Sequence, residues 1–116
     1  MSSTNYIKRI IKDYCVLDTE TTGLSARTDE IIEIGIVKVR DNKIVDRYSQ
    51  LIKPKKKISR FITDLTGITN EMVKGKPSIL EVEDEFLSFI GSDIIIGHNT
   101  SFDIRFQSGL SACYGE

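Results

Sequence analysis

The sequence lacks several features that would assign it to a class at once. Its two cysteines, Cys15 and Cys113, lie far apart and without metal-ligand spacing, so neither a disulfide framework nor a secreted protein is indicated. Sixteen basic and 17 acidic residues leave a net charge of −1, so any attraction for nucleic acid must be local. No apolar run is long enough for a signal peptide or a membrane span. These absences predict a cytoplasmic chain that does not engage a membrane.

The length and composition suit one small domain. A chain of 116 residues that is 40% hydrophobic can bury roughly two-thirds of its unfolded surface around a single core. We expect residues 1–12 to be an N-terminal extension and residues 13–116 to form the domain.

Hydrophobic periodicity predicts strands first and helices later. The expected strands are residues 14–19, 31–40, 43–52 and 94–96, and the expected helices lie near 59–65, at 79–90 and from residue 98 onward. Asp41-Asn42 suits a two-residue hairpin, and Ser78 with Glu81 forms a capping box. Gly67 ends the first helix, and Thr69 caps a short turn. The order β-β-β-α-α-β-α predicts an α/β fold with a mixed sheet.

The stretch LDTETTGL places two carboxylates, Asp18 and Glu20, just after an apolar strand. Residues two apart in a strand project to the same face, and like charges that close repel each other. The pair therefore requires a cation, a shared proton or plain solvation by water.

A third acidic residue, Asp103, follows the isoleucine triplet at 94–96. In open α/β sheets, sites collect where strands end, so Asp18, Glu20 and Asp103 can converge. Ligand sets made only of oxygen favour Mg²⁺ or Mn²⁺, which retain waters and accept substrate phosphates. A phosphate-transfer or phosphodiester-hydrolysis site is the chemical interpretation. The basic run at residues 53–60 is either a solvated loop or a contact for a nucleic-acid backbone.

Two motifs resemble those of a known family. Residues 18–24, DTETTGL, resemble the first motif of the DEDD-type 3′–5′ exonucleases, and residues 98–103, HNTSFD, resemble the second. Residues 65–69, LTGIT, are similar to the proofreading exonucleases of bacterial DNA polymerase III, namely the epsilon subunit and the exonuclease domain of the PolC-type polymerase. The resemblance spans about residues 13–110.

This resemblance implies a ribonuclease H-like fold in which a strand parallel to the first joins an antiparallel three-strand meander flanked by helices. It implies stepwise release of nucleoside 5′-monophosphates from a nucleic-acid 3′ end, expected to be single-stranded DNA, and an association with DNA polymerase subunits. Two Mg²⁺ or Mn²⁺ ions are implied, with Asp18 bridging both and Glu20 and Asp103 each holding one. The implied substrate contacts are Thr21, Thr22, Gly23, Leu24, His98, Asn99 and Phe102, with Leu24 wedged against the terminal base.

The sequence departs from the family pattern in one respect. The third motif, a His or Tyr followed by an Asp, lies some tens of residues beyond the second, whereas this sequence ends thirteen residues after Asp103. We therefore expect an N-terminal fragment without the fourth carboxylate, the general base, the last strand and the closing helix, and an isolated chain that is nearly inactive. The alternative is a catalytically dead ribonuclease H-like module that binds nucleic acid or protein.

Overall fold

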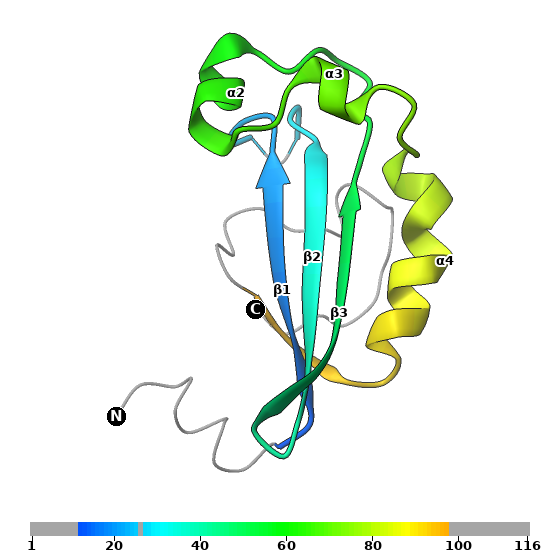
Figure 1. Cartoon of the computed structure of the whole chain (residues 1–116). Coiled ribbons are helices and arrows are strands. Elements are labelled where there is room, and N and C mark those ends of the chain that lie inside the picture. Colours follow the sequence, from blue (N-terminus) through cyan, green and yellow to red (C-terminus); the bar gives the residue numbers. More distant parts are fainter. Residues whose placement is uncertain (1–11, 26, 98–116) are drawn as a thin grey trace.

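The computed structural model describes residues 12–25 and 27–97, which contain a four-stranded sheet in the order β3-β2-β1-β4. Strands β1 (Tyr14–Thr21) and β3 (Lys43–Leu51) pair antiparallel with β2 (Ile31–Arg40). Strand β4 (Ile94–Gly97) pairs parallel with β1 (Figure 1). The predicted meander with one added parallel strand is confirmed. The predicted last helix, from residue 98 onward, lies outside the described residues.

Strand β1 is longer than the sequence predicts. Its ladder with β2 continues to Thr21, which pairs with Ile31 after a register shift between Glu20 and Thr21. The predicted end at residue 19 was wrong because pairing with β2 keeps the backbone extended beyond that point. Asp18 and Glu20 therefore lie within the strand, where the ladder fixes the face to which each side chain points.

The β2–β3 hairpin has the predicted two-residue connection. Asp41 and Asn42 have φ angles of 51° and 64°, and a positive φ at both positions is typical of the turn that matches the twist of a hairpin. Strand β3 forms an edge of the sheet, and Ile44 and Val45 on it are more than half exposed.

Three helices lie between β3 and β4. The predicted caps at Thr69 and Ser78 are confirmed, and Ser59 is a third cap that was not predicted. Helix α2 (Arg60–Thr66) and helix α3 (Asn70–Val73) start after Ser59 and Thr69, whose hydroxyls accept backbone N–H bonds. Gly67 ends α2 with a φ of 82°, a conformation that favours glycine. Helix α4 (Ile79–Ile90) begins with the full capping box. No helix in the described part of the chain is long and apolar enough to cross a membrane.

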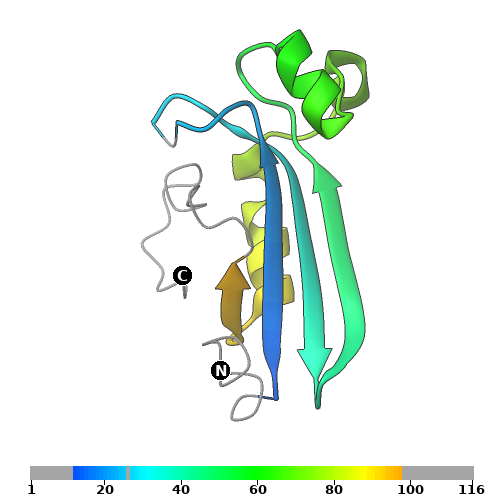
Figure 2. The same cartoon turned by 90° about the vertical axis from the view of Figure 1, so that its left-hand side faces the viewer.

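Two apolar clusters hold these elements together. Helix α4 lies against one face of the sheet (Figure 2). Its buried face, including Phe86, packs on Cys15, Ile34 and Ile36 of that face. A smaller cluster around Ile32 joins α2 and α3 to the end of the sheet where β1 finishes. This second cluster fixes α2 beside residues 21–24, the last residue of β1 and the start of the loop that follows it, which we call the TTGL loop.

Candidate active site

Asp18 and Glu20 share one face of β1, as the sequence predicts. The alternate residues Cys15 and Leu17 pack in the α4 cluster, so the carboxylates belong to the sheet face opposite α4. Asp18 is exposed and Glu20 is partly buried. Glycine 35 of β2 lies directly across from Asp18, which leaves the space beside that carboxylate without a facing side chain.

A third carboxylate, Glu33, joins this face. Glu33 is the β2 residue that pairs with Glu20, and these two side chains line a cavity of about 240 Å³ together with Asp18 and Ser49. Glu33 was not predicted as a site residue. Its signal was present, because Glu33 interrupts the run IIEIGIV with a charge, as Asp18 ends the apolar run of β1.

The carboxylates perturb one another electrostatically. Burial and the neighbouring charges of Asp18 and Glu33 raise the pKa of Glu20 above its ordinary value, because each disfavours a further negative charge. A hard divalent cation would offset this repulsion, and carboxylate oxygens are ligands that Mg²⁺ and Mn²⁺ accept. The donor chemistry therefore fits such an ion. Within residues 12–25 and 27–97, however, no group of three or more His, Cys, Asp or Glu side chains is arranged to hold one.

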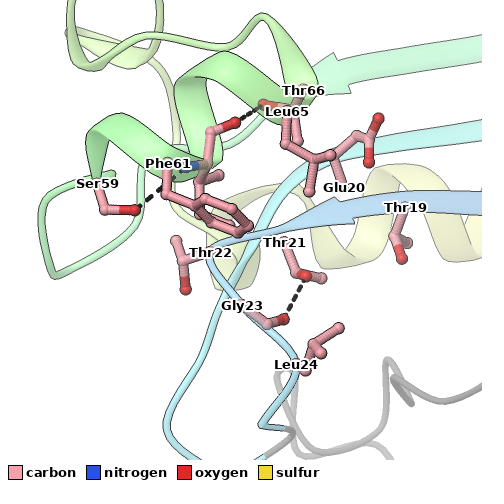
Figure 3. Close-up of a pocket in the computed structure, with 11 residues that line it drawn as sticks. Thr19, Glu20, Thr21, Thr22, Gly23, Leu24, Ser59, Phe61, Leu65 and Thr66 are labelled. Atoms are coloured by element: carbon pink, nitrogen blue, oxygen red, sulfur yellow. Dashed lines mark hydrogen bonds between the residues drawn. The ribbon is translucent and has the colours of Figure 1, made fainter.

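A larger groove of about 610 Å³ adjoins the carboxylate cavity. One wall is the TTGL loop at the end of β1, and the other is α2 (Figure 3). Three apolar side chains in the lining face solvent, namely Leu24, Phe61 and Leu65, with exposures of 91%, 72% and 71%. Glu20 lines both the groove and the carboxylate cavity. A ligand in the groove would therefore extend to the carboxylates.

Phe61 and Leu65 were not identified from the sequence. They lie one turn apart on α2, whose buried residue is Ile62, so this short helix carries apolar residues on more than its core-facing side. These additional apolar residues were the feature of the sequence that indicated an apolar surface outside the core. The sequence contained no indication that α2 would lie beside the TTGL loop, because this contact is purely tertiary.

Thr22 and Gly23 have structural roles in the TTGL loop. The Thr22 hydroxyl donates to Asp29 Oδ1 at 3.0 Å and accepts from the backbone N–H of Glu30 at 2.9 Å. The φ of Gly23 is not in the left-handed region. A Cβ atom there would lie 2.4 Å from Asp29 Oδ2, so the Asp29 carboxylate excludes a side chain at this position. Substrate contacts by either residue remain predictions.

The other predicted site residues come from the second motif. His98, Asn99, Phe102 and Asp103 lie outside the described residues. Their predicted convergence with Asp18 and Glu20 stays a prediction. The parallel pairing of β4 with β1 brings Gly97 opposite Leu17, next to the first carboxylate of the pair.

Sequence comparison connects the chain to nucleases. A model of the family described as Exonuclease matches residues 15–109. The PolC-type DNA polymerase III of Thermotoga petrophila is 56% identical over 93 residues, which are 80% of this chain and 7% of that protein. The corresponding polymerase of Bacillus subtilis is 41% identical over 104 residues, 88% of this chain and 7% of its own. The chain thus spans less than a tenth of the length of these relatives.

Solved structures agree on the fold. Exonuclease X in complex with 5′ overhanging duplex DNA is 40% identical with a TM-score of 0.66, and the match covers 80% of this chain and 52% of that one. Apo exonuclease I is 17% identical with a TM-score of 0.70, covering 83% of this chain and 23% of that one, which supports the fold alone. The predicted ribonuclease H-like class is confirmed.

Proposed function

Because the chain belongs to the exonuclease family, we propose that it is a metal-dependent 3′–5′ exonuclease domain of the proofreading type. The proposed reaction is hydrolysis of the terminal phosphodiester of single-stranded DNA, which releases a nucleoside 5′-monophosphate. The observation that carries this proposal is the shared position of Glu20. Its side chain borders both the carboxylate cavity and the apolar groove. A nucleotide whose base occupies the groove would have its phosphate beside the carboxylates.

Asp18 and Glu20 would hold the metal, with Asp103 as the further ligand expected from the second motif. When bound, paired Mg²⁺ or Mn²⁺ ions supply an activated water and stabilise the leaving oxygen of an in-line displacement. The residues of the chain hold the ions and orient the nucleotide. Glu33 adds negative charge on the same sheet face, which strengthens the attraction of that face for cations.

The groove suits a base that is bound without regard to sequence. Its exposed side chains are apolar, and stacking or packing against an apolar surface discriminates little among bases because every base has a flat face. Leu24 would pack against the terminal base from the loop, with Phe61 and Leu65 on the opposite wall. The PolC-type relatives are DNA polymerases, so DNA as substrate, polymerase subunits as partners and a cytoplasmic location are part of this proposal.

Metal titration tests the site. Mn²⁺ is titrated into the chain and into Asp18→Asn by isothermal calorimetry, with Asp84→Asn as the matched control because Asp84 is exposed on α4, away from the carboxylate face. We expect Asp18→Asn to weaken Mn²⁺ binding at least tenfold and Asp84→Asn to leave it unchanged. Equal affinity in all three proteins would contradict the assignment of Asp18 as a ligand.

Substrate binding is tested separately. A 5′-fluorescein-labelled oligodeoxythymidylate is titrated with protein in Ca²⁺, which occupies oxygen-ligand sites, and Leu24→Ala is compared with Leu80→Ala. Both leucines are exposed, at 91% and 63%, but Leu80 is on α4 and outside the groove. Only Leu24→Ala should weaken binding. An equal loss from both variants would mean that the groove does not take the base.

A further inference from the structure

We infer that Asp29 and Glu30 are positioning residues that hold the two walls of the groove at a fixed separation and so set its affinity for the 3′-terminal nucleotide. This inference rests on the proposed function. Neither residue lies in the motifs that identify the family, and neither was singled out in the sequence. We call the two residues and their contacts to the groove walls the Asp29–Glu30 brace.

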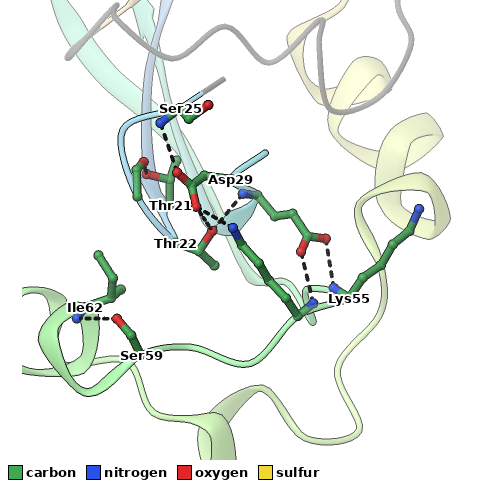
Figure 4. Close-up of polar contacts among 10 residues, drawn as sticks. Thr21, Thr22, Ser25, Asp29, Lys55, Ser59 and Ile62 are labelled. Carbon is green, nitrogen blue, oxygen red and sulfur yellow. Dashed lines mark hydrogen bonds and ion pairs between the residues drawn. The ribbon is translucent and has the colours of Figure 1, made fainter. Parts of the chain in front are cut away.

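Asp29 holds the first wall. Its carboxylate accepts the Thr22 hydroxyl on Oδ1 at 3.0 Å and the Ser25 backbone N–H on Oδ2 at 2.9 Å (Figure 4). The backbone N–H of Asp29 also donates to the Ser25 carbonyl at 2.7 Å. The close approach of the carboxylate to Gly23 places it directly against the loop backbone. These contacts enclose the segment that presents Leu24 to the groove.

The same two residues hold the segment that leads into the second wall. Lys56 Nζ lies 2.6 Å from Asp29 Oδ1. The Glu30 carboxylate accepts the backbone N–H groups of Lys55 and Lys56 at 2.8 and 3.1 Å. Ser59, the cap of α2, follows three residues after Lys56. The brace therefore joins both walls through two adjacent residues that directly precede β2.

The brace also assigns different roles to neighbouring lysines. The Lys56 ammonium forms an ion pair within the protein, whereas Lys55 donates to the brace through its backbone N–H. Replacing Lys55 by Met removes a charge and keeps that backbone bond. Replacing Lys56 by Met removes the same charge and also breaks the ion pair with Asp29.

This difference supplies a matched test in the full chain. Binding of the labelled oligodeoxythymidylate in Ca²⁺ is measured for the parent, Lys55→Met, Lys56→Met, Lys56→Arg and Asp29→Asn over a range of salt concentrations. We expect Asp29→Asn to weaken binding about tenfold, the equivalent of one charge-assisted hydrogen bond. Lys56→Met should weaken binding less, by about two- to fivefold, because the Lys56 side chain is 45% exposed and its ion pair contributes at most about 1 kcal/mol. Lys56→Arg should restore binding because it keeps the ion pair.

Salt dependence separates positioning from direct contact. A side chain that neutralises one phosphate of a single strand contributes about 0.7 to the slope of log affinity against log salt. The brace predicts an unchanged slope in Lys56→Met and unchanged Mn²⁺ affinity in every variant. A slope reduced by about 0.7, or an equal loss in Lys55→Met and Lys56→Met, would overturn the inference and make Lys56 a phosphate ligand.

Folding and function are controlled in the same experiment. Circular dichroism melts show whether Asp29→Asn remains folded, and Lys56→Met provides a second variant if it does not. If all variants bind like the parent, the brace does not set affinity and the proposed function stands. If the parent itself binds neither oligonucleotide nor Mn²⁺, the proposed function fails and this inference fails with it.

Discussion

Adding one methyl group at Gly23 should disrupt the TTGL loop through Asp29. A Cβ built on Gly23 would lie 2.4, 2.6 and 2.8 Å from Asp29 Oδ2, Cγ and Oδ1. All three distances are far shorter than van der Waals contact. Because the φ of Gly23 is not in the left-handed region, alanine fits the backbone, and the whole effect of the substitution comes from the Asp29 carboxylate.

The magnitude follows from what the displaced carboxylate would lose. Moving Asp29 breaks its bonds to the Thr22 hydroxyl and the Ser25 N–H, and hydrogen bonds to charged groups contribute about 1.5–3 kcal/mol each. The Lys56 ion pair adds little, roughly 0–1 kcal/mol, because Lys56 is 45% exposed. Since part of this loss is recovered by water, we expect Gly23→Ala to lower the free energy of unfolding by about 2–4 kcal/mol.

A double-mutant cycle isolates the clash. Urea unfolding is followed by circular dichroism, because the chain contains no tryptophan, for the parent, Gly23→Ala, Asp29→Ala and the double variant. In the Asp29→Ala background the atoms that meet the new Cβ are gone, so Gly23→Ala should be neutral or stabilise by about 0.4–1 kcal/mol through the unfolded state. Gly35→Ala is the matched control, because its Cβ would meet only Asp18 O at an ordinary 3.8 Å.

The outcome that refutes this reasoning is additivity. If Gly23→Ala destabilises the protein equally with Asp29 present and absent, the carboxylate is not what excludes a side chain there. A loss as large in Gly35→Ala would likewise show that glycine is needed for a general backbone reason in this sheet.

Four further predictions test other parts of the structure. Glu33→Gln removes a like charge across the strand pair, so it should bring the pKa of Glu20 back toward its ordinary value and raise the free energy of unfolding at pH 7 by roughly 0.2–1 kcal/mol. This gain in stability should vanish at acid pH, where these carboxyls are protonated. No gain at pH 7 would contradict the prediction. The hydrogen bonds from Lys56 and Ser25 lower the pKa of Asp29. The difference in free energy of unfolding between the parent protein and Asp29→Asn should therefore be complete at neutral pH and decline only as pH falls below the ordinary Asp pKa of about 3.9. A decline that begins near neutral pH would argue against this prediction. Burial, followed by the hydrogen bond to Asp93, raises the pKa of Cys15 to about 11. Iodoacetamide at pH 8 should therefore label Cys15 slowly in the folded chain and faster once urea unfolds it, as measured by peptide mass. Rapid labelling of the folded chain would contradict this prediction. In the described residues no strand pairs with the outer edge of β4, where Ile94 is 46% exposed. Light scattering should therefore detect self-association of the chain, which Ile94→Lys reduces and Ile44→Lys does not. A monodisperse parent protein would rule this prediction out.

Local rules account for much of the fold. The caps at Thr69 and Ser78 and the two-residue turn at Asp41-Asn42 were predicted, and the cap at Ser59 follows the same rule although it was not predicted. Each depends on residues within a few positions in sequence. The shared face of Asp18 and Glu20 was predictable for the same reason, since it follows from the two-residue period of a strand.

Local patterns thus predicted the type and order of the elements through β4, the carboxylate pair and the family resemblance, whereas the surroundings of that pair depend on tertiary contacts. Strand register placed Glu33 opposite Glu20, and a register is fixed by the pairing of whole strands. The second apolar cluster placed α2 beside the TTGL loop, and Asp29 and Glu30 joined the groove walls. These contacts connect residues distant in sequence, so no local pattern records them, and they exist only once the sheet and its helices have packed.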